Sequence, residues 1–442
     1  MWVREDLARR LRRVLRVARK TVTRLAEAGY TDPEDTNFSV RPEKVVAETA
    51  LLLLAASTVS DDEVAALVGE LAQELLPHAR GERMLLGAAL EPAAAWDYAQ
   101  AHVFLSRLGY PDAGFDNVLA ASDKAQAAYG RERVPHRALE RDWLRTGLTA
   151  ATSNDGLAPF VDLGALMHPI DLLCGSREDV YAFSHAVIYV GDFGIRPTIW
   201  PRPPAELCAE AEGALGRCLD EQDYDLAAEV LLTWPTTESA WSAAATFGFR
   251  VLAAVEDKAG FLPSHAVQLA RLSSLEGDDH TDYLLATNYH TVYVMGLLCS
   301  MALQPGKAPP ASIPVGNHIR GAADQIARFL RTGDRASPHW VTEFEQLSDV
   351  ERDALAPLLF SIAVRRCVQA RQFASVHELL AICHKLGLSD TPSASQTAEL
   401  LGRLATVTAV LDDRRDQAAY GQRLEADAPH TSTFTPRQVP GR

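Results

Sequence analysis

The sequence is poor in cysteine, has no long apolar run and carries no excess of positive charge. Its six cysteines among 442 residues include no Cys-x-x-Cys pair, which argues against a disulfide framework or a zinc ribbon and predicts reduced thiols. No apolar run reaches the roughly 18–20 residues that a membrane-spanning helix needs. Because 43 Lys and Arg face 58 Asp and Glu, for a net charge of −15, we expect no general binding of nucleic acid.

Several signatures of catalysis and targeting are also missing. The chain has no Gly-x-Ser-x-Gly elbow, no P-loop, no Gly-x-Gly-x-x-Gly after a strand and no His-Glu-x-x-His, so no nucleotide or flavin motif is present. Basic residues near the start are not followed by an apolar stretch, so we expect no secretory signal and a cytoplasmic location. The cofactor is left open, with a divalent metal as one option.

What the sequence has in abundance is helical periodicity. Apolar residues recur at spacings of three and four positions along most of the chain, whereas alternation with a period of two is nearly absent. The breaks between these segments are rich in Gly, Pro, Ser and Asp, which are typical helix stops and caps. The pattern predicts an all-α protein.

The predicted helices, about fifteen or more, are too many for a four-helix bundle. We expect a multi-helix array of α/α hairpins that is curved or closed like a toroid, with an open solenoid as the alternative. A Pro-rich stretch at 197–204 interrupts the helical pattern. We therefore expect an N-terminal helix at 1–28, helical halves at 29–197 and 198–425 that pack together, and a disordered tail at 426–442.

The predicted first helix is basic and amphipathic. Leu7, Leu11 and Val14 share one face, and Arg and Lys residues surround them. We interpret the segment as an ordinary helix docked on the protein, with contact to a membrane surface or a partner as the alternative.

Residues 167–194 hold the densest set of candidate functional side chains. Ser176 and Asp179 match a capping box, which predicts that a helix begins directly after Ser176 and fades at Gly191 or Gly194. The segment also contains two His and Asp pairs, one before the cap and one on the helix itself.

His185 and Asp192 are seven residues apart, so the periodicity predicts that they share a face of this helix. A His in an apolar and aromatic stripe, with a carboxylate at the helix end, suits general acid–base work or metal ligation. The alternative is a core His and a terminal Asp that are each satisfied by backbone groups. His168 and Asp171, just before the cap, are further catalytic candidates or parts of a structural turn.

A second candidate His lies in the middle of the helical segment 277–299. His290 there is surrounded by apolar and aromatic residues, as His185 is. We expect the two histidines to meet across a cavity, with a satisfied core His as the alternative. The aromatic residues beside them are expected to bind substrate: Tyr181, Tyr189, Tyr289 and Tyr293.

Two acidic runs need separate interpretations. Asp278, Asp279 and Asp282 spell Asp-Asp-x-x-Asp, which is similar to the magnesium-binding motif of prenyl-diphosphate enzymes. No second metal motif accompanies it, and acidic residues at a helix start are expected from capping alone. A terpene-cyclase-like enzyme is therefore a minor alternative. The run 220–225 is interpreted as a solvated turn between helices.

Four segments resemble landmarks of an uncharacterised all-helical family of actinomycete-type bacteria: 43–49, 134–144, 181–194 and 287–291. In the third segment the family pattern is Thr-His followed by Thr-Asp-Phe-Gly. Ser184 and Gly191 replace the two threonines here, whereas His185 and Asp192 keep their places. The resemblance spans about residues 40–410 and brings no established reaction. It implies a role in specialised-metabolite biosynthesis.

Two classes of function follow. In the first, an enzyme acts on a small, largely apolar substrate in a helical cavity by His/Asp acid–base or metal-assisted chemistry of the lyase, cyclase or hydrolase type. In the second, a helical scaffold without catalytic activity binds a biosynthetic enzyme or a carrier protein, and its first helix or its tail makes the contact.

Overall fold

The computed structural model describes residues 2–26, 29–31, 39–126, 133–149, 161–195, 198–316, 319–330 and 338–426. Helices dominate these residues, which confirms the predicted all-α class. Two strands of two residues each, β1 (Tyr30–Thr31) and β2 (Ser39–Val40), form a short antiparallel pair. No disulfide joins the six cysteines, all of which lie in the described ranges.

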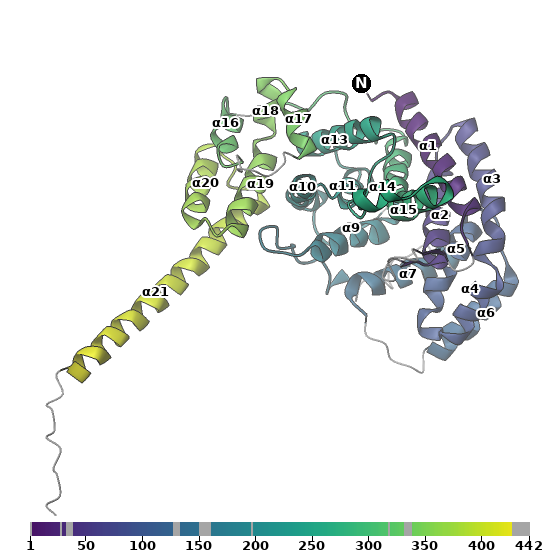
Figure 1. Cartoon of the computed structure of the whole chain (residues 1–442), viewed down its shortest axis with the longest axis horizontal. Helices are drawn as coiled ribbons and strands as arrows, with labels where there is room; N and C mark the ends of the chain where they lie inside the picture. Colours follow the sequence, from purple (N-terminus) through teal and green to yellow (C-terminus); the bar gives the residue numbers. More distant parts are fainter. Residues whose placement is uncertain are drawn as a thin grey trace, which may run out of the picture.

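The helices follow one another along the chain (Figure 1). Their bounds are α1 (Arg4–Thr23), α2 (Pro42–Ala56), α3 (Asp62–Ala79), α4 (Glu82–Leu90), α5 (Ala95–Arg107), α6 (Ala113–Gln126), α7 (Pro135–Thr149), α9 (Arg177–Gly191), α10 (Pro204–Glu221), α11 (Tyr224–Leu231), α12 (Thr233–Thr236), α13 (Ala243–Ala259), α14 (Leu269–Ser274), α15 (Gly277–Ala302), α16 (Ala322–Ala327), α17 (His339–Glu345), α18 (Asp349–Ala354), α19 (Ala356–Gln369), α20 (Phe373–Lys385) and α21 (Pro392–Ala426).

Helix α1 packs against α15, α3 and α2. Its apolar stripe, which includes Leu7, Leu11 and Val14, is buried. Its basic side chains are paired, as in the 2.8 Å contact of Arg19 with Glu70 on α3. The stripe is therefore part of the core, and the positive charge is largely matched by neighbouring carboxylates.

Six helices form a closed cycle of contacts. Each member of the series α2, α5, α7, α9, α11 and α15 packs against the next, and α15 packs against α2. The cycle joins helices from both sides of the predicted boundary at 197/198, since α9 contacts α11. A ring of helices leaves a space along its axis that side chains either fill or line.

The C-terminal helices lie on the opposite side of the molecule from α1–α6 (Figure 1). Helix α19 packs against α10, and α20 packs against α19. Helix α21 begins against α10, α19 and α20 and then extends far away from the rest of the protein (Figure 1). Of the predicted tail, residues 427–442 lie outside the described ranges.

Candidate functional site

A cavity of about 710 Å³ lies inside the cycle of six helices. Every helix of the cycle contributes to its lining. The aromatic lining residues include Trp96, Phe104, Trp143, Tyr181 and Tyr189. Charged residues and two histidines line the rest of the cavity, so its surface is partly apolar and partly charged.

His185 reaches the cavity from α9. The capping box of Ser176 and Asp179 is present at the start of this helix, which confirms the prediction. The Nδ1 atom of His185 lies 3.0 Å from the carbonyl oxygen of Tyr181, one turn earlier. The rings of Tyr181 and Tyr189 flank the imidazole at centroid distances of 3.8 and 5.6 Å.

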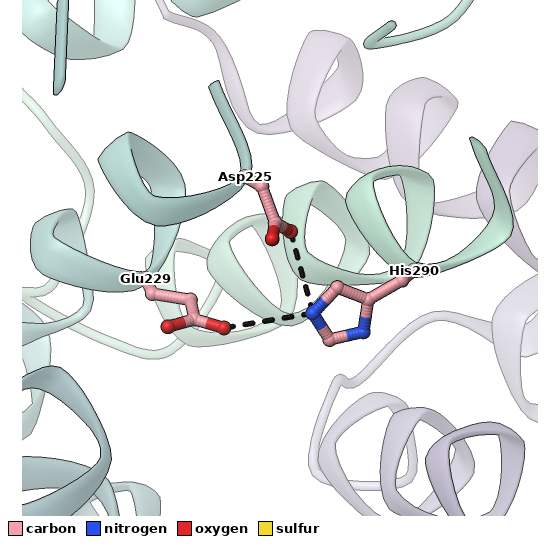
Figure 2. Close-up of side chains that lie close together, drawn as sticks. All are labelled: Asp225, Glu229 and His290. Carbon is pink, nitrogen blue, oxygen red and sulfur yellow. Dashed lines mark ion pairs between the residues drawn. The ribbon is translucent and has the colours of Figure 1, made fainter. Parts of the chain in front are cut away.

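His290 reaches the same cavity from α15 and is surrounded by carboxylates. Its Nδ1 lies 2.9 Å from Oε2 of Glu48 on α2. Its Nε2 lies 3.4 Å from Oδ1 of Asp225 and 3.6 Å from Oε1 of Glu229, both on α11 (Figure 2). Burial by itself lowers the pKa of His290, but the charges of Asp225 and Glu48 raise that pKa well above its usual value.

Glu229 connects the two histidines. Its Oε2 lies 3.3 Å from Nδ1 of His185 and accepts a 2.9 Å hydrogen bond from the hydroxyl of Ser184, while Oε1 faces His290. Burial favours the neutral acid, but His185 and then His290 hold the pKa of Glu229 well below its usual range. Burial raises the pKa of the adjacent Asp225, because His290 only partly compensates for it. Asp225 and Glu229 are thus neighbouring carboxylates whose pKa values are shifted in opposite directions.

A second polar group lines the cavity beside the histidine centre. Glu140 on α7 accepts a 2.8 Å hydrogen bond from the hydroxyl of Tyr189 and a 2.8 Å bond from Arg137. The guanidinium of Arg137 also lies 3.4 Å from the hydroxyl of Tyr181. Trp143 stacks on Tyr189 at 5.1 Å. Burial raises the pKa of both tyrosines, so their hydroxyls remain protonated donors.

Asp192 does not join His185, contrary to the expectation from periodicity. Helix α9 ends at Gly191, and Asp192 takes a left-handed backbone conformation with φ of 43°. Its two carboxylate oxygens accept hydrogen bonds of 2.9 Å each from Arg107, and Oδ1 also accepts one of 2.6 Å from Trp143. The turn at the helix end breaks the predicted shared face and places Asp192 outside the cavity lining.

His168 and Asp171 also lie away from the cavity. Both are exposed, and Oδ1 of Asp171 accepts hydrogen bonds from the backbone of Leu173 at 3.0 Å and Cys174 at 2.8 Å. This arrangement is the structural turn that was the alternative for the pair. Tyr289 is buried but is not part of the cavity lining, whereas Tyr293 is.

The Asp-Asp-x-x-Asp run lies at the surface start of α15. Asp278 and Asp282 both pair with Arg24, at 3.0 and 2.5 Å, and Asp279 is exposed. None of the three lines the cavity. Asp278 and Asp282 therefore link Arg24, at the end of α1, to the start of α15.

The central carboxylates were missed by reasoning from the sequence. The run 220–225, interpreted as solvated, is instead partly buried: Asp223 and Tyr224 are buried, and the side chain of Asp225 is only 13% exposed. A signal was present, because Asp225 and Glu229 are spaced by four positions and so share a helical face. Glu48 offered no such signal, since its partner His290 lies 242 positions away.

Comparison with known proteins places the ring of helices within one family. The sequence model of DUF6895, a domain of unknown function, matches residues 10–300. The chain belongs to the DUF6895 family. This confirms the expected resemblance to an uncharacterised all-helical family. All of the residues that line the cavity lie in the DUF6895 stretch, whereas α16–α21 follow it.

No curated protein and no solved structure matched the chain. Within the described ranges, no helix of this DUF6895 protein combines the length and the apolar character that a membrane crossing requires.

Proposed function

We propose that this DUF6895 protein is an enzyme that transfers protons to and from a small molecule bound in its helical cavity, with His185 as the acid–base group. The observation that carries the proposal is the connection of His185 and His290 through one buried carboxylate, Glu229, at the surface of a cavity of about 710 Å³. A cavity of this size accommodates a small organic molecule. Lyase, cyclase and hydrolase reactions all use such a group.

The geometry of His185 supports a defined proton position. A backbone carbonyl is only an acceptor, so the contact with Tyr181 requires a proton on Nδ1. In the neutral ring, Nε2 then carries the lone pair and serves as the base. Within the described part of the chain no hydrogen bond engages Nε2, which leaves it available to a molecule in the cavity.

Glu229 supports the charge that His185 gains during such a step. When Nε2 accepts a proton, the imidazolium is stabilised by the carboxylate that lies 3.3 Å from Nδ1. The hydroxyl of Ser184 holds the same carboxylate oxygen in place. A buried carboxylate behind a histidine orients the ring and stabilises the imidazolium in other acid–base sites.

The lining indicates a substrate with both apolar and polar parts. The rings of Trp143, Tyr181 and Tyr189 offer apolar and stacking surface. The guanidinium of Arg137 and the hydroxyl of Tyr181 offer donors to an oxygen of the substrate. The cavity would thus orient an apolar body by stacking and a polar end by hydrogen bonds.

A metabolite-depletion experiment tests the proposal. Purified protein is incubated with a small-molecule extract of the source organism, and mass spectrometry follows compounds that are consumed or formed. We expect wild type to convert at least one compound and His185→Gln to lose the conversion by roughly 100-fold or more, the upper range for acid–base groups. Glu229→Gln should also slow it.

A matched histidine provides the control. His384 on α20 is bonded to Ser389 at 2.7 Å on the surface, so His384→Gln should convert the compound as fast as wild type. Circular dichroism checks that both variants fold. Absence of any wild-type conversion, or equal conversion by His185→Gln, would contradict the proposal.

Helix α21 favours a second candidate, a binding role outside the cavity. It extends away from the body of the protein (Figure 1), and Val407, Val410 and Leu411 on it are 46–52% exposed. Exposed apolar side chains on a projecting helix are typical of a surface that a partner helix covers. This candidate is a scaffold for a biosynthetic enzyme or carrier protein, with α21 as the contact surface in place of the first helix or the tail.

Affinity capture tests the second candidate. Wild type and a triple variant, Val407→Glu, Val410→Glu and Leu411→Glu, serve as bait in an extract of the source organism. A partner retained by wild type and lost with the variant, then titrated in purified form, would support a scaffold. Identical recovery by both baits would remove α21 as the contact surface.

A further inference from the structure

We propose that Asp225, Glu229 and His290 bind one divalent transition-metal ion, most favourably Zn²⁺, at the surface of the cavity. One ligand atom from each of the three residues lies within 4.8 Å of the others. Asp225 and Glu229 follow each other by one turn on α11, and His290 faces both from α15 (Figure 2). The site combines one imidazole nitrogen with two carboxylate oxygens.

The separations of the ligand atoms fit a metal ion. Around a tetrahedral ion with bonds of about 2.1 Å, neighbouring ligand atoms lie about 3.4 Å apart. Nε2 of His290 lies 3.4 Å from Oδ1 of Asp225 and 3.6 Å from Oε1 of Glu229. The oxygens of Asp225 and Glu229 lie within 4.8 Å of each other, so an ion would draw these two side chains toward the same tetrahedral spacing.

The neighbouring residues hold each ligand in the required form. Glu48 lies 2.9 Å from Nδ1 of His290, so the Nδ1 proton stays on the ring. The carboxylates raise the pKa of His290, so a metal ion binds by displacing the proton from Nε2. Carboxylate–histidine–metal arrangements of this kind are common in metalloproteins. Ser184 bonds the second oxygen of Glu229 at 2.9 Å, and Arg177 lies 3.4 Å from the second oxygen of Asp225.

An independent observation is the state of Oδ1 of Asp225. This atom is buried, and no group in the described ranges forms a hydrogen bond with it. Its ion pair with Nε2 of His290 is 3.4 Å long, and a buried carboxylate oxygen that lacks a hydrogen bond is costly in a folded protein. A cation at this point would coordinate it. The same oxygen is the one that faces His290.

The ligand set and the open side decide which ions fit. One nitrogen and two oxygens suit Zn²⁺ or Mn²⁺ better than Mg²⁺, which prefers oxygen ligands and water. Three protein ligands leave a fourth position, and the cavity adjoins all three residues. A water molecule or a substrate oxygen would occupy that position, as in catalytic zinc sites.

The metal site stands without the proposed function, because binding is measured in the absence of substrate. If the metal site and the proposed acid–base function are both correct, the ion would polarise the substrate or an attacking water molecule, and His185 would accept or donate the proton. His185 is not one of the three ligands, so His185→Gln should lose conversion and keep the metal.

The experiment is a titration of the full untagged chain, stripped with a chelator and dialysed, with Zn²⁺, Mn²⁺ and Mg²⁺ chlorides in a calorimeter. We expect about one Zn²⁺ per chain, with weaker binding of Mn²⁺ and weakest of Mg²⁺. Asp225→Asn and Glu229→Gln should each weaken Zn²⁺ binding by roughly 100-fold or more, and Glu48→Gln by roughly 10–100-fold. Asp278→Asn is the matched control and should bind as wild type does.

The outcomes separate the proposal from its competitors. No stoichiometric Zn²⁺ or Mn²⁺ on wild type, or full binding by both Asp225→Asn and Glu229→Gln, would overturn it. Loss of binding in Asp278→Asn alone would place the ion at the surface acidic run and overturn it equally. If a cavity variant does not fold, X-ray absorption of zinc-loaded wild type decides. The proposal requires the outer-shell scattering of one imidazole ring around the ion, and its absence contradicts the proposal.

Discussion

The replacement of Asp192 by Ala distinguishes a structural carboxylate from a catalytic one. The side chain of Asp192 is 6% exposed and that of Arg107 is 13% exposed. Removing the carboxylate leaves the guanidinium buried without its bidentate partner and takes an acceptor from Trp143. Breaking a buried pair in this way costs about 3–5 kcal/mol. We therefore expect the free energy of unfolding of Asp192→Ala to fall by about that amount.

Urea unfolding followed by circular dichroism measures this loss. Asp192→Asn should be milder, because Asn tolerates the left-handed backbone and keeps one acceptor oxygen. The double variant Asp192→Ala with Arg107→Met should be more stable than Asp192→Ala alone, since no unpaired charge remains buried. Asp278→Ala, which removes an exposed ion pair with Arg24, should change stability by less than about 1 kcal/mol.

An Asp192→Ala variant that is as stable as wild type would contradict the structural role of this carboxylate. If that folded variant also loses conversion of a substrate, Asp192 belongs to the reaction, as the periodicity of α9 suggested. A loss of stability with normal conversion by the folded fraction would establish the structural role.

Three further predictions concern the core. Arg10 and Glu256 form an ion pair, and their side chains are 1% and 2% exposed. Arg10→Met should therefore lower the free energy of unfolding in urea by about 3–5 kcal/mol. Adding Glu256→Gln to this variant should recover much of the loss. A Cβ on Gly296 would lie 2.6 Å from Val14, so Gly296→Ala should cost about 1–3 kcal/mol by overpacking, and an unchanged melting temperature would refute the contact. Burial, with Arg137 and His185, lowers the pKa of His136 to about 4. The unfolded chain then binds more protons between pH 6.5 and 4, so stability should fall as the pH falls through this window, and His136→Gln should flatten that dependence.

The helices themselves were predictable because their signals are local. The capping box of Ser176 and Asp179 occupies four consecutive positions, and its hydrogen bonds form within one turn. Apolar spacing marked the buried stripe of α1 in the same way. Such features depend only on residues close to one another in the chain, so they can be predicted from the sequence alone.

Part of the cavity lining was predictable for the same reason. His185, His290, Tyr181 and Tyr189 were found from polar or aromatic side chains inside apolar helical faces, and all four line the cavity. Asp192 was misplaced because the helix ends one residue before it. Periodicity assumes that the helix continues, and the left-handed turn that ends it here was only loosely marked in the sequence.

The sequence by itself determined that the chain is helical, where several helices begin and which histidines lie on apolar faces. Only the tertiary structure decided which carboxylates meet those histidines. Glu48 and His290 are 242 positions apart, and their 2.9 Å contact exists because α2 packs against α15. In the sequence, Asp225 belongs to an acidic run that predicts a solvated turn. In the structure, α11 packs against α9 and α15, and this packing largely removes Asp225 from solvent. Charge and periodicity are properties of short segments, whereas the cavity and its network of charges arise from packing between helices distant in the chain.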